Sequence, residues 1–206
     1  MTTAPDGRDL IGPVVELRKL RVEDAEELFR ALDDARVWAL GYGGGPAGRP
    51  TSEAGMVGWV STLLARHGQV PYAIRTSETS ELGPRGTLVG TSSLGDVDLL
   101  NRRVHLGWTA YTPAAWATQV NPAAKLLLLG HAFDDCGMHR VKIQTDAVNL
   151  RSQSAIARLG AVREGVLRQH VMRADGTWRD TVVYSILADE WPTVRTRLEH
   201  RLGIGG

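Results

Sequence analysis

Cysteine, lysine and long apolar segments are all scarce in this chain of 206 residues. Cys136 is the single cysteine, so no internal disulfide is possible, and this composition is typical of a reducing compartment. Lysine occurs only at Lys19, Lys125 and Lys142, and arginine supplies the rest of the 24 basic residues. The longest purely aliphatic run, residues 126–129, is far too short to span a bilayer.

Net charge is also nearly absent. The 24 basic and 23 acidic residues leave a formal charge of +1, so no strong field draws the chain to nucleic acid or to an anionic membrane. The first ten residues are polar and lack the basic-then-apolar pattern of a secretory signal peptide. We therefore expect a cytoplasmic protein without nucleic-acid or membrane partners.

The residues that are present fit one ordinary folded domain. Hydrophobic residues make up 43% of the chain and charged residues 23%, which is close to the globular average and sufficient for one sizeable core. No internal repeat and no long linker divides the chain, so we expect a single domain over residues 1–206.

Hydrophobic periodicity predicts alternating strands and helices. Strands are expected at residues 14–20, 72–75, 87–94, 103–111, 140–146, 166–173 and 178–187. Helices are expected at residues 23–32, from a cap at Thr51 or Ser52 to near Gly68, and at 121–136, 150–159 and 190–202. This order indicates a mixed α/β sheet covered by helices, because a doubly wound parallel fold would alternate strand and helix throughout.

Two local signals in the second half are specific. Asn121 followed by Pro122 predicts a helix N-cap and a proline at the first helical position. Asp175-Gly176 between two alternating segments predicts a two-residue hairpin turn.

Three segments, in order, resemble parts of a known family. LRKLRVEDAEELFRAL is similar to its first strand and helix, and HLGWTAYTPAAW to its fourth strand and the start of its cofactor loop. LLLLGHAFDDCGMHRVKIQTDAVNLRSQSAIARLGAVREGVLRQHVMRADGTWRDTVVYSIL is similar to its C-terminal half. Over residues 17–198 the chain resembles the GNAT acetyltransferase superfamily, specifically its RimJ/RimL-like branch.

The resemblance implies an α/β (α+β) fold with a mixed, mostly antiparallel twisted sheet whose fourth and fifth strands splay apart. It implies that acetyl-CoA donates an acetyl group to an amine, either a protein N-terminus or a small molecule, by direct transfer in a ternary complex without a metal ion. A non-catalytic acyl-CoA-binding sensor or structural module is the alternative from a different class. Monomer and homodimer both stay open.

By the same resemblance, pantetheine lies between the splayed strands and pyrophosphate lies at the helix start near Asn121. Helix N-termini attract phosphate in any family, because their free N–H groups and positive dipole end face the ligand. Ala117 and Gln119 stand where the family pattern has glycines, and Gln119 is the larger departure. The residues expected to contact the cofactor are Thr109, Ala110, Tyr111, Trp116, Ala117, Thr118, Gln119, Val120, Asn121, Ala123, Asn149 and Arg158.

His105 and Ser152 are the expected catalytic residues. His105 occupies the place where many family members have an acidic general base, and a pKa of about 6.5 suits an imidazole to accept a proton near neutral pH. Ser152, which with Asn149 matches the family's Asn-x-x-Ser, is expected to protonate the departing thiolate. The alternatives are a solvent-facing His105 and plain capping roles for Asn149 and Ser152. His170 and Glu164 are reserve candidates for the base.

Two other clusters are expected to have no chemistry of their own. The glycine-rich residues 41–45 lack a following Gly-Lys-Ser/Thr, so they form a loop beside the acceptor site rather than a nucleotide P-loop. His131 with Asp134 and Asp135 lacks zinc-ligand spacing and is expected to be a surface face.

Overall fold

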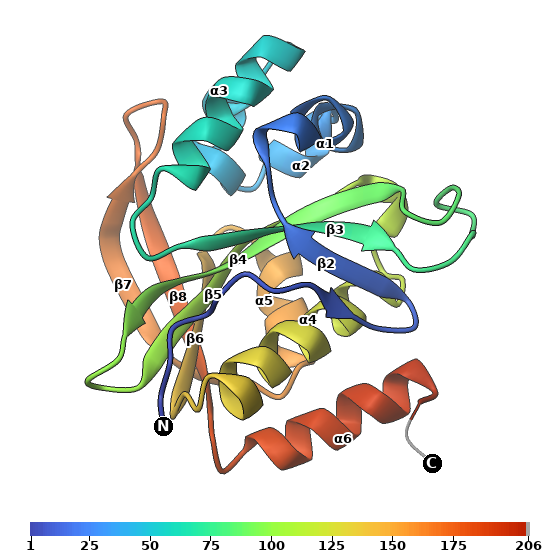
Figure 1. The fold of residues 1–206 in the computed structure, drawn as a ribbon. Coiled ribbons are helices and arrows are strands. Elements are labelled where there is room, and N and C mark those ends of the chain that lie inside the picture. The colour runs from blue at the N-terminus through green and yellow to red at the C-terminus, as the bar shows by residue number, and fades with distance from the viewer. Residues whose placement is uncertain (205–206) are drawn as a thin grey trace.

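A computed structural model describes residues 1–204, which form one eight-stranded sheet in the order β1-β2-β3-β4-β5-β6-β8-β7 (Figure 1). All neighbouring strands pair antiparallel except β5 and β6, which are parallel. The expected mixed, mostly antiparallel α/β fold is confirmed. The strands are β1 (Leu10–Ile11), β2 (Val15–Lys19), β3 (Val70–Thr76), β4 (Leu88–Asp98), β5 (Arg103–Tyr111), β6 (Arg140–Asp146), β7 (Val162–Met172) and β8 (Trp178–Leu187).

Helices cover both faces of the sheet. In Figure 1 the upper face lies under α1 (Ala25–Leu32), α2 (Ala35–Trp38) and α3 (Glu53–Leu64). The lower face packs on α4 (Val120–Gly130), α5 (Leu150–Ala157) and α6 (Trp191–Leu202). Short 3₁₀ turns are η1 (Val22–Asp24), η2 (Tyr42–Gly44), η3 (Pro46–Gly48) and η4 (Pro113–Ala115), and α4 continues into one π turn, η5 (His131–Asp135). No helix of the described chain has the length and hydrophobicity that a membrane span requires.

The two faces have separate cores. The upper core consists of Leu20, Ala25, Leu28, Leu32, Val37, Trp38, Met56, Val60, Leu63, Ala73, Leu88 and Ala110. The lower core is larger and joins the inner faces of α4, α5 and α6 to the other side of the sheet, with Leu106, Val141 and Leu128 fully buried at its centre. Burial of apolar surface contributes about 25 cal/mol per Å². Because the helices on each side bury their apolar faces against the sheet, each helix layer is stabilised by its own core.

Several elements lie where strong local sequence signals predict them. Strands β5, β6 and β8 have the predicted bounds. Ser52 caps α3 by accepting a hydrogen bond from the Gly55 N–H at 3.1 Å. Gly176 does lie in the hairpin between β7 and β8 and adopts φ +83°, which a side chain would oppose. The predicted two-residue turn is wrong, however, because residues 173–177 separate the strands and the Arg173 N–H donates to the Thr177 carbonyl at 2.7 Å.

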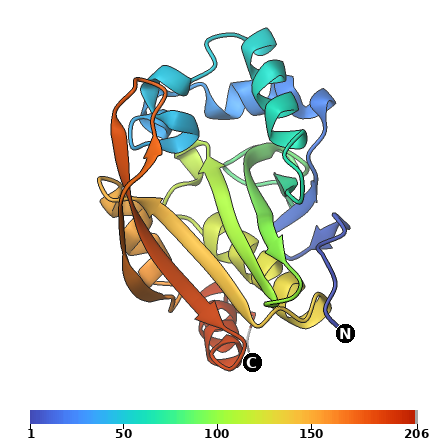
Figure 2. The same ribbon diagram turned by 90° about the vertical axis from the view of Figure 1, so that its left-hand side faces the viewer.

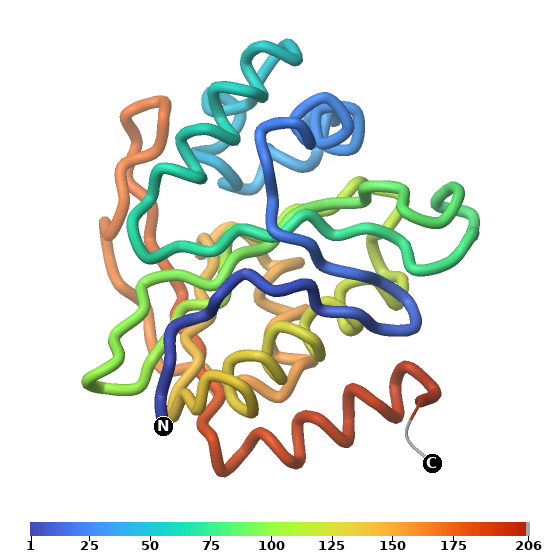
Figure 3. Tube along the Cα trace, in the orientation of Figure 1, coloured from blue at the N-terminus to red at the C-terminus, as the bar shows by residue number. Residues whose placement is uncertain are grey.

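Other elements differ from their predictions. Strand β7 begins at Val162, four residues before its predicted start, because pairing with β8 continues through a register shift between Arg163 and Gly165. The sequence missed β1 and α2, which are too short for periodicity to reveal. The chain before β1 follows the end of the α4–η5 segment (Figure 3), where the Thr3 N–H donates to the Cys136 carbonyl at 3.0 Å.

The predicted N-cap at Asn121 is wrong. Helix α4 begins at Val120, and the Thr118 hydroxyl accepts a hydrogen bond from the Val120 N–H at 3.2 Å. Pro122 is consequently the third helical residue rather than the first. It is tolerated because N–H groups of the first turn have no partner within a helix in any case.

Strands β5 and β6 separate soon after they meet. Only three residue pairs join them, Arg103 to Arg140, Val104 to Val141 and His105 to Lys142, and Figure 2 shows the two strands diverging from that end. A β-bulge in β5 lies just beyond the last pair, where Trp108 adopts the left-handed φ of +50°. The predicted splay of the central strands is confirmed.

A lysine is buried beneath this bulge. The Lys125 side chain of α4 is 5% exposed, and its Nζ donates to Thr109 Oγ1 at 2.7 Å and to Ser92 Oγ at 3.1 Å. Both partners are neutral, and no carboxylate pairs with Lys125 in the described chain. Burial therefore lowers its pKa from the ordinary 10.5 to about 7.

This depressed pKa predicts that stability depends on pH through Lys125. The folded state loses the proton near pH 7 and the unfolded state near pH 10.5, so the free energy of unfolding should rise between these values, by up to about 5 kcal/mol. Urea unfolding at several pH values should show that the wild type gains stability relative to Lys125→Met as the pH rises above about 7. Below about pH 7, the difference in unfolding free energy between the two proteins should be constant.

Lys19→Met is the matched control, because Lys19 is exposed and should leave the pH profile of the wild type unchanged. Parallel profiles for the wild type and Lys125→Met would contradict a buried lysine with a low pKa.

Candidate active site

A cleft of about 580 Å³ opens where β5 and β6 diverge. Its walls come from both helix layers, because the gap between the strands leaves the sheet incomplete at this point. The upper wall comes from α2, α3 and the loop after α2, and the lower wall from the start of α4 and from α5. The arrangement allows two molecules to approach one point from opposite faces.

Aromatic side chains form the upper wall. The Tyr42 and Trp59 ring centroids are 5.9 Å apart, and Trp108 of the bulge lies 5.9 Å from the Arg66 guanidinium. The glycine-rich loop is part of this wall, since Tyr42 lines the cleft and Gly44 accepts a hydrogen bond from the Ala174 N–H at 3.2 Å. Gly41 is required there, because its φ is +90° and a Cβ would lie 2.6 Å from Asp146 Oδ2.

His105 lies in the cleft beside an aspartate. Its side chain is 4% exposed, so the alternative of a solvent-facing histidine is wrong. Nδ1 lies 3.2 Å from Asp96 Oδ2, and the same oxygen accepts from Lys142 Nζ at 3.2 Å. Nε2 is buried with no hydrogen-bond partner in residues 1–204 and lies over Gly107, where a Cβ would be 2.6 Å away.

The electrostatics of this pair keep His105 neutral and Asp96 ionised. Burial lowers the pKa of His105 and is the largest effect, while the hydrogen bond that His105 donates to Asp96 raises it. The pKa of Asp96 lies well below its usual range because Asp96 accepts this hydrogen bond from His105, with Lys142 assisting. A neutral histidine whose Nδ1–H donates a hydrogen bond to a carboxylate presents an unprotonated Nε2, which is what a proton acceptor requires.

The turn before α4 has its strain at Ala117. Ala117 adopts φ +61°, the left-handed region in which glycine is preferred, whereas Gln119 has an ordinary φ of −73°. The sequence-based expectation that Gln119 is the more serious departure is therefore wrong for the backbone. Thr118 Oγ1 donates to the Ala115 carbonyl at 2.7 Å and so fixes the turn.

The amides at the helix start are only partly free. The Val120 N–H bonds Thr118 and the Ala123 N–H bonds the Gln119 carbonyl, and the side chains of Val120 and Ala123 are buried in the lower core. The N–H groups of Thr118, Gln119 and Asn121 have no partner among the described residues. A phosphate at this helix end would meet those three amides.

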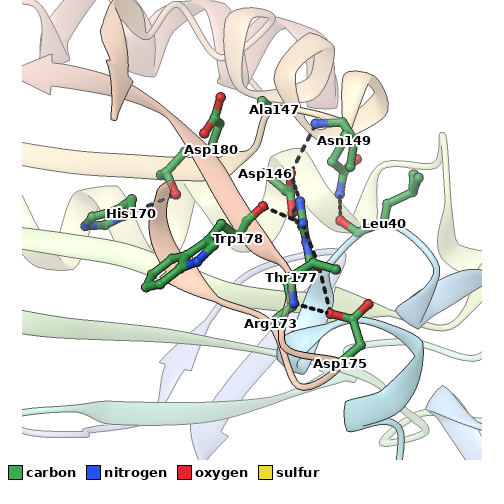
Figure 4. Close-up of polar contacts among 12 residues, drawn as sticks. Leu40, Asp146, Ala147, Asn149, His170, Arg173, Asp175, Thr177, Trp178 and Asp180 are labelled. Atoms are coloured by element: carbon green, nitrogen blue, oxygen red, sulfur yellow. Dashed lines mark hydrogen bonds and ion pairs between the residues drawn. The ribbon is translucent and has the colours of Figure 1, made fainter. Parts of the chain in front are cut away.

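The start of α5 forms the opposite edge of the lower wall. Asn149 caps the helix by accepting from the Ser152 N–H at 2.9 Å, and its Nδ2 donates to the Leu40 carbonyl at 3.3 Å (Figure 4). The alternative of a capping role is thus confirmed for Asn149. The Arg151 guanidinium stacks 3.5 Å from the centre of the Trp116 ring.

The structure brings most of the sequence-predicted residues to the cleft. Gln119, Val120 and Ala123 do not line it with their side chains. The reserve bases do not line it either: His170 lies 3.1 Å from Thr181 Oγ1, and Glu164 is paired with Arg140. The predicted residues that line it are His105, Ser152, Thr109, Ala110, Tyr111, Trp116, Ala117, Thr118, Asn121, Asn149 and Arg158.

Sequence reasoning missed three polar residues at or beside the cleft. Asp96 gave no signal, because only the pairing of β4 with β5 brings it to His105. Lys125 did give a sequence signal, because a single charged residue within the apolar segment PAAKLLLL is unusual for a helix face that is buried. Arg179 lines the cleft from β8, within electrostatic reach of the ion pair of Arg173 with Asp146.

The predicted surface position of the His131 cluster is confirmed for Asp134 and Asp135, which are exposed, and is wrong for His131. His131 is 2% exposed, and its Nδ1 lies 2.9 Å from Asp135 Oδ2. Within residues 1–204 no three His, Cys, Asp or Glu side chains gather in a group that could hold a metal ion.

Known proteins share this fold and parts of this sequence. YdaF of Bacillus subtilis (strain 168), provisionally named a ribosomal N-acetyltransferase, is 29% identical over 106 residues, which are 52% of this chain and 57% of YdaF. That alignment spans little more than half of YdaF. A provisionally named acetyltransferase from T. thermophilus has a solved structure with TM-score 0.83 and 33% identity over 98% of this chain and 100% of its own.

A third relative is described with a ligand. RimJ of Mycobacterium smegmatis, solved in complex with CoA-disulfide, superposes with TM-score 0.74 and 24% identity over 97% of this chain and 95% of its own. YdaF and RimJ agree with the predicted RimJ/RimL-like branch. The family model described as an acetyltransferase (GNAT) domain matches residues 15–162, a range that includes the diverging strands, the α4 start and the α5 start. With that match and the shared fold, this chain belongs to the GNAT acetyltransferase family.

Proposed function

We propose that this protein transfers the acetyl group of acetyl-CoA to an amine by direct attack in a ternary complex. The observation that carries the proposal is the gap between β5 and β6 beyond His105 and Lys142, which ends at the start of α4. Strand edges that face such a gap offer N–H and C=O groups to an extended, amide-containing chain such as pantetheine. The RimJ complex with CoA-disulfide supports a coenzyme A ligand for this fold.

In this proposal the phosphates of acetyl-CoA bind at the lower wall of the cleft. The free amides of Thr118, Gln119 and Asn121 bind the pyrophosphate, and the positive end of the α4 dipole favours it. Arg158 of the cleft wall meets the 3′-phosphate. Val120 and Ala123 support this site only by fixing the first turn of α4, since their side chains are in the core and their N–H groups are already bonded.

The reaction needs a proton acceptor for the amine. The amine nitrogen attacks the thioester carbonyl carbon and its proton goes to His105 Nε2, the unpaired and unprotonated nitrogen. Asp96 is a positioning residue, because it fixes the tautomer through Nδ1. Amides of the β5 bulge, around Thr109 and Ala110, stabilise the negative oxygen that develops.

Collapse of this intermediate breaks the C–S bond and releases a thiolate. Ser152 is proposed to donate a proton to that sulfur. Its side chain lines the cleft, and its own N–H is held by Asn149, so its position at the first turn of α5 is fixed. Proximity of the two bound substrates supplies much of the rate enhancement, because no covalent enzyme intermediate is needed.

The proposal predicts that acetyl-CoA binds the folded chain and that amines release its thiol. Saturating acetyl-CoA should raise the melting temperature, because a ligand at 100 times its Kd stabilises the folded state by about 2.7 kcal/mol. Thermal unfolding and a thiol-release assay over an amine panel test the two parts. A thermal shift without thiol release would favour the non-catalytic sensor, and no shift would contradict both functions.

The second prediction concerns the His105–Asp96 pair. With one amine as substrate, turnover should rise with pH through the pKa of His105, which burial places below about 6.5. His105→Ala should remove that limb and lower turnover by about 10²–10⁴-fold. Asp96→Asn should move the limb to lower pH, because the lost hydrogen bond raised the pKa of His105.

His67→Ala is the matched control for His105, because His67 is exposed and lies outside the cleft. An acidic limb that persists unchanged in His105→Ala would belong to the substrate amine and would remove His105 from the mechanism.

A third prediction separates chemistry from binding at α5. Ser152→Ala should lower kcat by about 10–100-fold and change the Kd of coenzyme A by less than about threefold, because a proton donor acts mainly in the transition state. Steady-state kinetics and calorimetric binding measure the two quantities. Ser154→Ala, an exposed serine of the same helix, should resemble the wild type, and an equal result for Ser152→Ala would make Ser152 a structural residue only.

A further inference from the structure

The cleft has an excess of positive charge that an amine acceptor does not explain. Asp146 is the one carboxylate among its lining residues, and Arg173 binds it through bonds of 2.8, 3.0 and 3.1 Å (Figure 4). The cationic lining residues are Arg66, Arg151, Arg158, Arg179 and Arg201, while Lys125, with a pKa of about 7, carries only part of a charge near neutral pH. An ammonium group that enters this cleft is repelled unless the same molecule also carries negative charge.

The cations are divided between the two walls. Arg151 and Arg158 lie on or next to α5, on the lower side where the proposed phosphates of acetyl-CoA account for them. Arg66 follows α3 on the upper side. Side chains along a strand point alternately to the two faces of the sheet. The even-numbered β8 residues Val182 and Tyr184 face the lower core, so the odd-numbered Arg179 is on the upper side. The upper cations therefore lie toward the acceptor rather than the phosphates.

Arg179 is the upper-side cation with a buried nitrogen that lacks a hydrogen-bond partner in residues 1–204. Its Nε is buried and has no hydrogen-bond partner within the part of the chain that the structure describes. Burial lowers the pKa of its guanidinium, and the attraction of Asp146 offsets this only in part because Arg173 lies beside the same carboxylate. Buried donors in proteins are normally paired, so this half-buried guanidinium with an unpaired Nε is suited to bind an anion from outside the chain.

The form of the guanidinium indicates which anion fits. A single planar fork matches the two oxygens and single charge of a carboxylate, whereas a phosphate dianion normally gathers more than one cation. We propose that the acceptor is an amine that carries a carboxylate, and that Arg179 binds this carboxylate while the amine lies toward His105. This inference rests on the proposed acetyl transfer, since it names the acceptor class for that same cleft.

Matched substrates test this proposal in two arms. Phenylalanine against phenylalaninamide tests an α-carboxylate, with a side chain suited to the aromatic upper wall. Two peptide amides that begin with aspartate or asparagine test a side-chain carboxylate. In at least one arm the acid should have a kcat/KM about 10- to 100-fold above its amide, the range for a hydrogen bond to a charged group. Arg179→Gln should bring that ratio to about one.

Binding provides a readout that does not require turnover. Calorimetry with the same four probes, in the presence of coenzyme A, should show tighter binding of the acid in the wild type and not in Arg179→Gln. Arg168→Gln is the control, because Arg168 is exposed on β7 outside the cleft and should keep the preference. Arg179→Lys should keep part of it, since it retains the charge and loses the fork.

The outcomes separate this inference from the proposed function. Thiol release without a preference for the acid in either arm, together with equal or undetectable binding of acids and amides, would overturn the inference and leave acetyl transfer intact. An acid preference that survives in Arg179→Gln would also overturn it. Arg179-dependent binding of the acid without thiol release would support the carboxylate site and contradict the acetyl transfer.

Discussion

Two parallel strands share three residue pairs and then part, and the backbone groups along their open edges require partners from elsewhere. In an ordinary sheet this would be an unfavourable defect at the centre of the molecule. Here the gap is also where both helix layers meet, because α4 and α5 border it from below and the loop before α3 borders it from above. The cleft and the exposure of the α4 start to it depend on that one break in pairing.

The break is maintained by features that are each costly alone. Trp108 holds a left-handed backbone conformation in the β5 bulge, and such strain persists only where the surroundings determine it. Beneath the bulge, Lys125 ties the hydroxyls of Ser92 and Thr109 together and gives up its usual charge near neutral pH to do so. A bulge that twists the strand and a polar cluster that anchors it keep β5 from closing onto β6.

Local charge in this protein has little to do with total charge. A chain with a formal charge of +1 lines its cleft with five arginines, with Lys125, whose pKa lies at about 7, and with one carboxylate that is already paired. Several acids elsewhere are paired in exposed positions, as in the contact of Arg30 with Glu26, where water screens them. Among the cleft arginines, the half-buried Arg179 interacts most strongly with a nearby charge, since a low dielectric strengthens the interaction.

The sequence by itself determined those features that depend on residues close together in the chain. Alternation fixed β5, β6 and β8, the Ser52 hydroxyl set the start of α3, and Gly176 set the hairpin, because each depends on backbone preferences over a few residues. The resemblance also led to His105. Only the tertiary structure decided that Asp96 lies beside His105, that Lys125 is buried and that Arg179 lines the cleft, because these depend on strand pairings and helix contacts across the fold. Burial and charge pairing are properties of that arrangement in space, and no local pattern in the chain records them.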